Sequence, residues 1–134
     1  MYPFTLKHQS AFTLLEITMV VTIIGIMAMF ALPRYLNLLE KFRAKEGEHV
    51  LLTLLAAQKR YSIDNAGSYA ALLSNLDVDI RDPENFAMPA VANNPAQLAT
   101  IDRDGGGPLY TLSINASGTI SCSSGSGICV QIGY

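Results

Sequence analysis

The side chains that could do chemistry in this 134-residue chain are few and widely spaced. The histidines are His8 and His49, and the cysteines are Cys122 and Cys129. Two cysteines cannot supply the four ligands of a structural zinc site, so a disulfide and a pair of free thiols are the alternatives. No nucleophile lies in a motif with a base, and no set of ligands has metal-binding spacing. We therefore expect no catalytic residues, no metal site, no cofactor and no enzymatic activity.

Glu16 differs from the other acidic residues because it lies inside an apolar run. It is the single charged residue between positions 12 and 32. As a helix this run is about 31 Å long, which matches a bilayer core of about 30 Å. A carboxylate there costs on the order of 2.5–3.5 kcal/mol at the centre of the bilayer, and less near an end. Glu16 therefore needs a partner or a function, unless it simply reaches the membrane surface.

The residues before the apolar run offer a candidate partner for Glu16. Residues 1–11 form a short polar leader whose small residues, Ser10 and Ala11, precede the apolar run instead of following it. Cleavage between Ala11 and Phe12 would create an α-amino group four residues before Glu16. That cation could pair with Glu16 of the same helix or of a neighbouring subunit. The alternative is an uncleaved signal anchor.

The pattern becomes amphipathic after Pro33. Apolar residues then recur every three or four positions as far as Tyr61, and an Asn-Ala-Gly-Ser cluster at 65–68 ends the helix. We expect a transmembrane helix at 12–33 that continues as an amphipathic helix at 34–64. Glycine lowers helix stability by about 1 kcal/mol, and proline removes a backbone hydrogen bond. Gly25 and Pro33 therefore make the segment between them the easiest to kink.

The remaining residues predict a loop followed by a small sheet. Residues 65–97 contain prolines and acidic residues, and a short helical turn is expected near 68–76. The acids at 77, 79, 82 and 84 do not follow the calcium-binding EF-hand pattern, so we interpret them as solvated residues that keep the loop soluble. Residues 98–134 are expected to form an antiparallel sheet packed on the helix. Its predicted strands are 98–103, 109–114 and 118–122, with 128–132 as a fourth candidate.

Charge and size limit the function further. The chain has nine Lys and Arg residues and eleven acids, so its net charge gives no basic field that would attract nucleic acid. Net charge alone does not decide whether a local patch binds DNA. The segment after the long helix is too short for a large core, so a covalent link would help. A disulfide between Cys122 and Cys129 would contribute about 2.5 kcal/mol and would fit an oxidising compartment.

The sequence AFTLLEI at 11–17, followed by MVVTIIGIMAMFALPRY at 19–35, closely resembles the prepilin signature of type IV pilins and pseudopilins. The resemblance implies that a prepilin peptidase cuts after Ala11 and that Phe12 becomes the N-methylated first residue. It implies that Glu16 neutralises a neighbour's amino terminus during assembly. Gly25 and Pro33 match the helix-softening positions of the family. This chain has Ala11 where the family usually has glycine.

The resemblance also implies an α+β pilin fold, in which a long N-terminal helix packs on a small antiparallel sheet. Cys122 and Cys129 would form the disulfide that bounds the C-terminal region. The first expectation is a type IV pilus subunit, held in the inner membrane as a single-pass protein before assembly. It would form an extracellular homopolymer for adhesion, twitching motility or DNA uptake, with the prepilin peptidase and the pilus assembly machinery as partners.

Two alternatives remain. One is a pseudopilin of a type II secretion system, although the cysteine pair and the absence of tryptophan argue against the major pseudopilin. The other is a signal-anchored envelope binding protein, which would keep its leader and tolerate the loss of Glu16.

Overall fold

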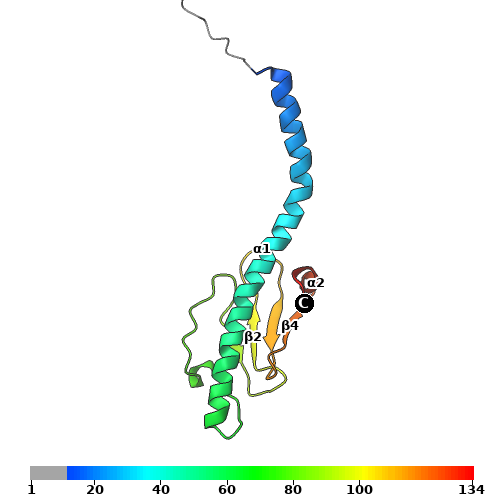
Figure 1. Cartoon of the computed structure of the whole chain (residues 1–134). Helices are drawn as coiled ribbons and strands as arrows, with labels where there is room; N and C mark the ends of the chain where they lie inside the picture. Colours follow the sequence, from blue (N-terminus) through cyan, green and yellow to red (C-terminus); the bar gives the residue numbers. More distant parts are fainter. Residues whose placement is uncertain (1–11) are drawn as a thin grey trace, which may run out of the picture. The chain divides into compact units, whose positions relative to one another are not determined.

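The computed structural model describes residues 12–134, so the leader at 1–11 and the proposed cleavage position Ala11 lie outside the described residues. The first element is the long helix α1 (Leu14–Asp64), which continues through both Gly25 and Pro33. After it come the 3-10 helix η1 (Leu73–Asn75), strands β1 (Ala90–Val91), β2 (Ala99–Asp102), β3 (Thr111–Ile114) and β4 (Ile120–Ser123), and the short helix α2 (Ile128–Ile132). Figure 1 shows this order along the chain.

The chain divides into two compact units, one ending at Leu36 and the other comprising Asn37–Tyr134. Among the described residues of the first unit, the only regular element is the N-terminal part of α1. The second unit contains the rest of α1, the sheet and α2.

The sheet of the second unit is a meander of four antiparallel strands in the order β1-β2-β3-β4. Ile101 pairs with Leu112, and Leu112 with Cys122, so one face of the central strands is apolar. Alternate residues turn toward α1, as Ala99, Ile101, Leu112 and Ile114 are all buried. Strands that bury every second residue are typical of a sheet with one solvated face. The α+β fold expected from the sequence is confirmed.

The core lies between this sheet and the amphipathic part of α1. The helix contributes buried residues at three- and four-residue spacing, Ala44, Leu51, Leu54 and Leu55 among them. Gly47 belongs to the same side and allows the Phe86 ring to approach the helix backbone closely. Of the apolar residues whose spacing predicted an amphipathic helix, Leu54 and Ala57 are buried in this core, whereas Phe42 is 67% exposed.

One predicted strand is wrong. Residues 128–132 form the helix α2 instead of a strand. Gly127 and Gly133 flank it in the left-handed conformation, with φ of 70° and 101°, and these glycines turn the chain at both ends. Cys129 is bonded to Cys122, which holds α2 close to β4. The sequence also gave no signal for β1, whose two residues lie inside the predicted loop.

Candidate functional site

The first unit exposes an apolar helix. Every described residue from 12 to 38 is exposed, including Met29, Phe30 and Leu32. Among the described residues, α1 is the one helix that is long and apolar enough to cross a membrane. The hydroxyls of Thr18 and Thr22 donate to carbonyls of the same helix, at 2.8 and 2.7 Å. These threonines therefore do not require polar partners outside the helix.

Glu16 lies in the first turn of α1. Its backbone N–H donates to the side-chain oxygen of Thr13 at 3.2 Å, which is the geometry of an N-terminal cap. The sequence Thr13-Leu14-Leu15-Glu16 has the spacing of a capping box, and an acid in the first turn is favoured by the helix dipole. In the described part of the chain the Glu16 carboxylate has no hydrogen-bond partner. It is therefore available to a cation outside this chain or to an amine at Phe12.

Phe12 itself precedes α1 and is 75% exposed. Phe12 and Glu16 are brought into one short segment, at the capped end of the helix. Pairing between their amine and carboxylate stays a prediction, as do cleavage and methylation.

The second unit holds a buried ionic network that the sequence did not reveal. Glu40 and Arg103 are each only 4% exposed, and Arg103 Nε donates to Glu40 Oε1 at 2.6 Å. Tyr110 donates its hydroxyl to the same oxygen at 3.2 Å, and Arg43 donates to Glu40 Oε2 at 3.1 Å. The Arg103 guanidinium also donates to the Asn85 carbonyl. The network thus ties α1 to the end of β2, the start of β3 and the preceding loop.

The network controls the protonation of its members. Burial alone would raise the pKa of Glu40, but hydrogen bonds from Arg103 and Arg43 outweigh it and keep the pKa below its usual value. Burial and the nearby Glu40 carboxylate raise the pKa of Tyr110 well above its usual value. Glu40 is therefore the anionic acceptor and Tyr110 the neutral donor at neutral pH.

Three side chains of α1 fix the loop that precedes β2. Gln58 is fully buried and forms two hydrogen bonds with the backbone of Ala70, at 2.9 and 2.8 Å. Arg60 donates to both carboxylate oxygens of Asp77. Glu46 accepts from the backbone N–H of Glu84 and from the Asn85 amide. The loop is irregular, yet these bonds place it along α1.

The C-terminal residues are fixed in a similar way. Cys122 and Cys129 form a disulfide, and Ile128 and Ile132 of α2 are buried in the core. Tyr134 donates its hydroxyl to Glu48 at 2.9 Å, and Glu48 also accepts from Lys45 at 2.6 Å. The hydrogen bond from Lys45 lowers the pKa of Glu48, and burial raises that of Tyr134.

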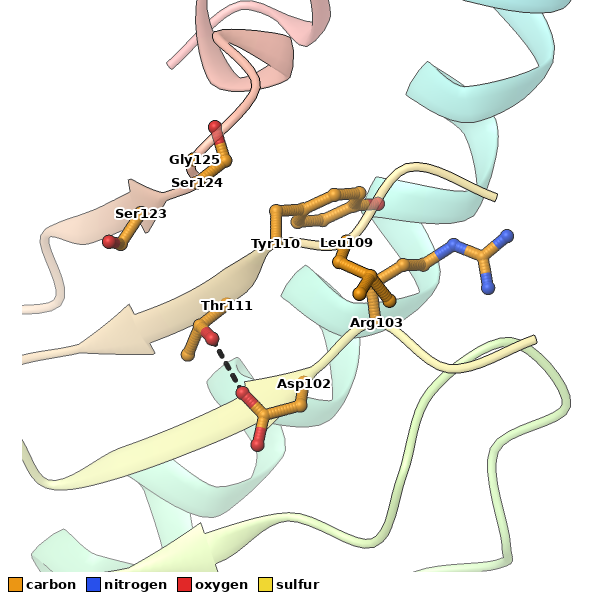
Figure 2. A pocket seen from close by; sticks show the side chains of 8 residues that line it. All are labelled: Asp102, Arg103, Leu109, Tyr110, Thr111, Ser123, Ser124 and Gly125. Atoms are coloured by element: carbon orange, nitrogen blue, oxygen red, sulfur yellow. Dashed lines mark hydrogen bonds between the residues drawn. The ribbon is translucent and has the colours of Figure 1, made fainter. Parts of the chain in front are cut away.

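An open hollow of about 420 Å³ lies on the sheet surface next to the disulfide loop. Asp102, Thr111 and Ser123 form one row across β2, β3 and β4, and Thr111 donates to Asp102 at 2.5 Å (Figure 2). This row offers two hydroxyls and one carboxylate, and no histidine, cysteine or lysine lines the hollow. No group of three His, Cys, Asp or Glu residues that could hold a metal occurs within residues 12–134.

Sequence reasoning singled out the apolar helix, Glu16 and the cysteines, but it missed Glu40, Gly47, Gln58 and Arg103. One signal was present: Glu40, Gly47 and Gln58 fall on the apolar side of the amphipathic helix, where a polar residue or a glycine is unexpected. Arg103 and Tyr110 gave no such signal, because their partner Glu40 lies more than sixty residues away in the chain.

Comparison with known proteins identifies relatives of one kind. The chain is 27% identical to the type II secretion system core protein G of Pseudomonas aeruginosa over 104 residues, covering 78% of this chain and 72% of the relative. It is 28% identical to the protein of the same name from Aeromonas hydrophila, over 79% of this chain and 73% of the relative. The Vibrio cholerae protein is 32% identical over 60% of this chain and 54% of the relative. No family profile and no solved structure matches the chain.

Proposed function

Because the chain belongs to the superfamily of type IV pilins and pseudopilins, we propose that it is a structural subunit of the pseudopilus of a type II secretion system. The subunit polymerises through the apolar part of α1 and has no catalytic activity of its own. The observation that carries the proposal is the exposed apolar helix, with one unpartnered carboxylate in its first turn.

The physical reason for assembly is burial of this helix. Large apolar side chains line all sides of α1 up to Leu36, and the second unit has its own core. Before assembly the bilayer covers this surface, and in a filament the helices of neighbouring copies cover it. Glu16 is the one charged side chain between positions 12 and 32, so an amine at Phe12 of a neighbouring subunit would neutralise it.

The pseudopilus is a better assignment than the surface pilus, which the sequence favoured first. The three relatives carry the name of a type II secretion component, and two of them are covered over more than two thirds of their length. The cysteine pair and the absence of tryptophan argued against a major pseudopilin. Those two compositional features weigh less than similarity over most of the chain.

Processing and location follow from the same proposal. The prepilin peptidase removes residues 1–11 and methylates Phe12, and the subunit waits in the inner membrane as a single-pass protein. Its polymer then acts inside the secretion machinery of the envelope, with identical subunits as its main partners. This placement fits an oxidising compartment, in which the Cys122–Cys129 disulfide persists.

Replacement of Glu16 tests the assembly mechanism. Cells that contain the secretion machinery would produce wild-type chain, Glu16→Ala or the control Thr22→Ala, and sedimented filaments would be quantified. Thr22 is a suitable control because it lies on the same apolar segment and its hydroxyl is satisfied by the Thr18 carbonyl. Glu16→Ala should insert into the membrane normally but lose filaments, and Thr22→Ala should retain them. Wild-type filament yield from Glu16→Ala would refute the mechanism.

A deletion distinguishes the pseudopilus from the pilus. Loss of the chain should abolish release of secreted proteins while surface pili and twitching motility persist. The reverse pattern would favour the type IV pilus subunit.

A further inference from the structure

Within residues 37–134, α1 has a side that neither the sheet nor the loops cover. Leu38, Phe42 and Leu52 on this side are 51%, 67% and 45% exposed. His49 and Ala56 lie between and beyond them, at the three- to four-residue spacing of one helix face. We call these five residues the outer stripe. An exposed apolar stripe of this kind is typical of a surface that packs against a partner.

Lysines line one edge of the outer stripe. Lys41, Lys45 and Lys59 are all exposed, and their spacing places them on one side of α1 together with Leu52. Lys45 donates to Glu48, but Lys41 and Lys59 have no acidic partner within residues 12–134. We call these three residues the lysine edge.

The opposite edge of the outer stripe is formed by the loop before β2. Glu46 and Arg60 lie four helical turns apart on one side of α1, and both bind this loop. Their partners, Asp77 and Glu84, mark the two ends of the segment that runs beside the helix. In Figure 1 this segment belongs to the loop beside the lower part of α1.

This loop segment is acidic. Asp79, Asp82 and Glu84 are exposed, and none of them has a cationic partner in the described part of the chain. Arg81 is the one cation between positions 77 and 84. We call residues 77–84 the acidic edge. The Arg60–Asp77 pair shows that a cation of α1 and a carboxylate of this segment can form a bidentate contact.

Within residues 12–134 no ion pair joins the two edges, which lie on opposite sides of the outer stripe. They can do so between two copies that lie side by side. Such a contact joins two different surfaces, and a heterologous contact of this type propagates into a ring or a helical filament. Opposite charges at the two edges would also set the register between copies.

We propose that the lysine edge of one subunit docks on the acidic edge of the neighbouring subunit and thereby covers the outer stripe. The partner is a second copy of this chain. The inference rests on the proposed function, since it assigns a lateral contact of the second unit to the same polymer. It adds a contact that does not involve the apolar N-terminal helix.

Charge reversal tests the contact in the full-length chain, with sedimented filaments as the readout. The first variant carries Lys41→Glu and Lys59→Glu, the second carries Asp79→Lys and Asp82→Lys, and the third combines all four changes. Asp102→Lys is the control, since Asp102 is exposed on the sheet and belongs to neither edge. Each reversed variant should lose about tenfold or more of its filament yield, because like charges then face each other.

The combined variant should recover most of the wild-type yield, because its edges are again complementary. Wild-type yield from both reversed variants would overturn the proposal. Failure of the combined variant to recover, with protease resistance equal to that of the wild type, would also overturn it. If the combined variant is protease-sensitive, the filament yield of the wild type is measured at increasing salt concentration instead. Salt should lower the wild-type yield, because it screens the attraction between the two edges.

The outcome also separates this inference from the proposed function. If the wild type and every charge-reversed variant form filaments with equal yield, the proposed pseudopilus function stands and the lateral contact is refuted. A wild type without filaments would instead contradict the proposed function. In that case the contact is measured as self-association of the detergent-solubilised chain by ultracentrifugation, which the reversals must weaken.

Discussion

Gly47 offers the sharpest test of how α1 packs on the rest of the second unit. A Cβ at this position would lie 2.8 Å from Cζ and 3.0 Å from Cε1 of Phe86, and 3.2 Å from Cδ1 of Leu112. Phe86 cannot easily withdraw, because it is buried and its ring contacts Tyr110 edge-to-face at a centroid distance of 6.0 Å. The guanidinium carbon Cζ of Arg103 lies over the same Phe86 ring, 5.9 Å from its centroid.

Two opposing effects decide the result of Gly47→Ala. Alanine favours the helix by about 1 kcal/mol relative to glycine. Overpacking a core costs about 1–3 kcal/mol, and contacts as short as those to Phe86 place this site at the upper end. The net expectation is a loss of about 1–2 kcal/mol in the free energy of unfolding. A residue that improves the helix should therefore destabilise the protein.

The assay is denaturant unfolding of the full-length chain in detergent, followed by the near-ultraviolet circular dichroism of its tyrosines. Gly25→Ala is the matched control, because no heavy atom lies within 4 Å of its added Cβ. In a Phe86→Leu background, Gly47→Ala should become neutral or stabilising. An unfolding midpoint of Gly47→Ala at or above that of the wild type would refute the packing described for Phe86.

Three further predictions concern single side chains of the second unit. Ala66→Gly should raise the free energy of unfolding by about 0.5–1 kcal/mol, because Ala66 has a φ of 52°, at which a side chain is strained. Thermal unfolding of the two proteins measures this difference in stability. Gln58→Leu should lower that free energy by about 2 kcal/mol in urea unfolding, since it leaves the buried N–H and carbonyl of Ala70 unpaired. Equal unfolding midpoints would contradict the contribution of these two hydrogen bonds. The pKa of Glu40 is lower in the folded protein than in the unfolded chain, where it is near 4.5. Ionised Glu40 therefore contributes fully to the free energy of unfolding above the unfolded pKa, and this contribution is lost as the pH falls through the folded pKa. Glu40→Gln should flatten this acid limb of the stability curve, and an unchanged limb would show that other carboxylates cause it.

The long helix could be predicted because its signals are local. An uncharged apolar run, a threonine followed by glutamate three positions later, and a three- to four-residue repeat are all properties of neighbouring residues. The same is true of β3, whose alternation is visible in residues 109–114. In the structure that strand begins at Thr111, and the residue before it, Tyr110, donates its hydroxyl to Glu40.

The features that could not be predicted depend on distant partners. Residues 128–132 are apolar enough for a strand, and only the flanking left-handed glycines and the disulfide explain why they form α2. The residues around Glu40 in the sequence do not indicate that it is buried. Its partners, Arg103 and Tyr110, lie more than sixty residues away in the chain. The position of the acidic edge likewise depends on distant partners, since Arg60 and Glu46 hold the loop at 77–84 along α1.

We propose that this chain is a processed subunit that assembles through the N-terminal part of α1. The intact mass and N-terminal fragment spectrum of the protein isolated from its native envelope test this proposal. The spectrum should show a chain that begins at Phe12 and carries one added methyl group. A chain that retains the residues before Phe12, in cells with an active prepilin peptidase, would contradict it and favour an anchored envelope protein.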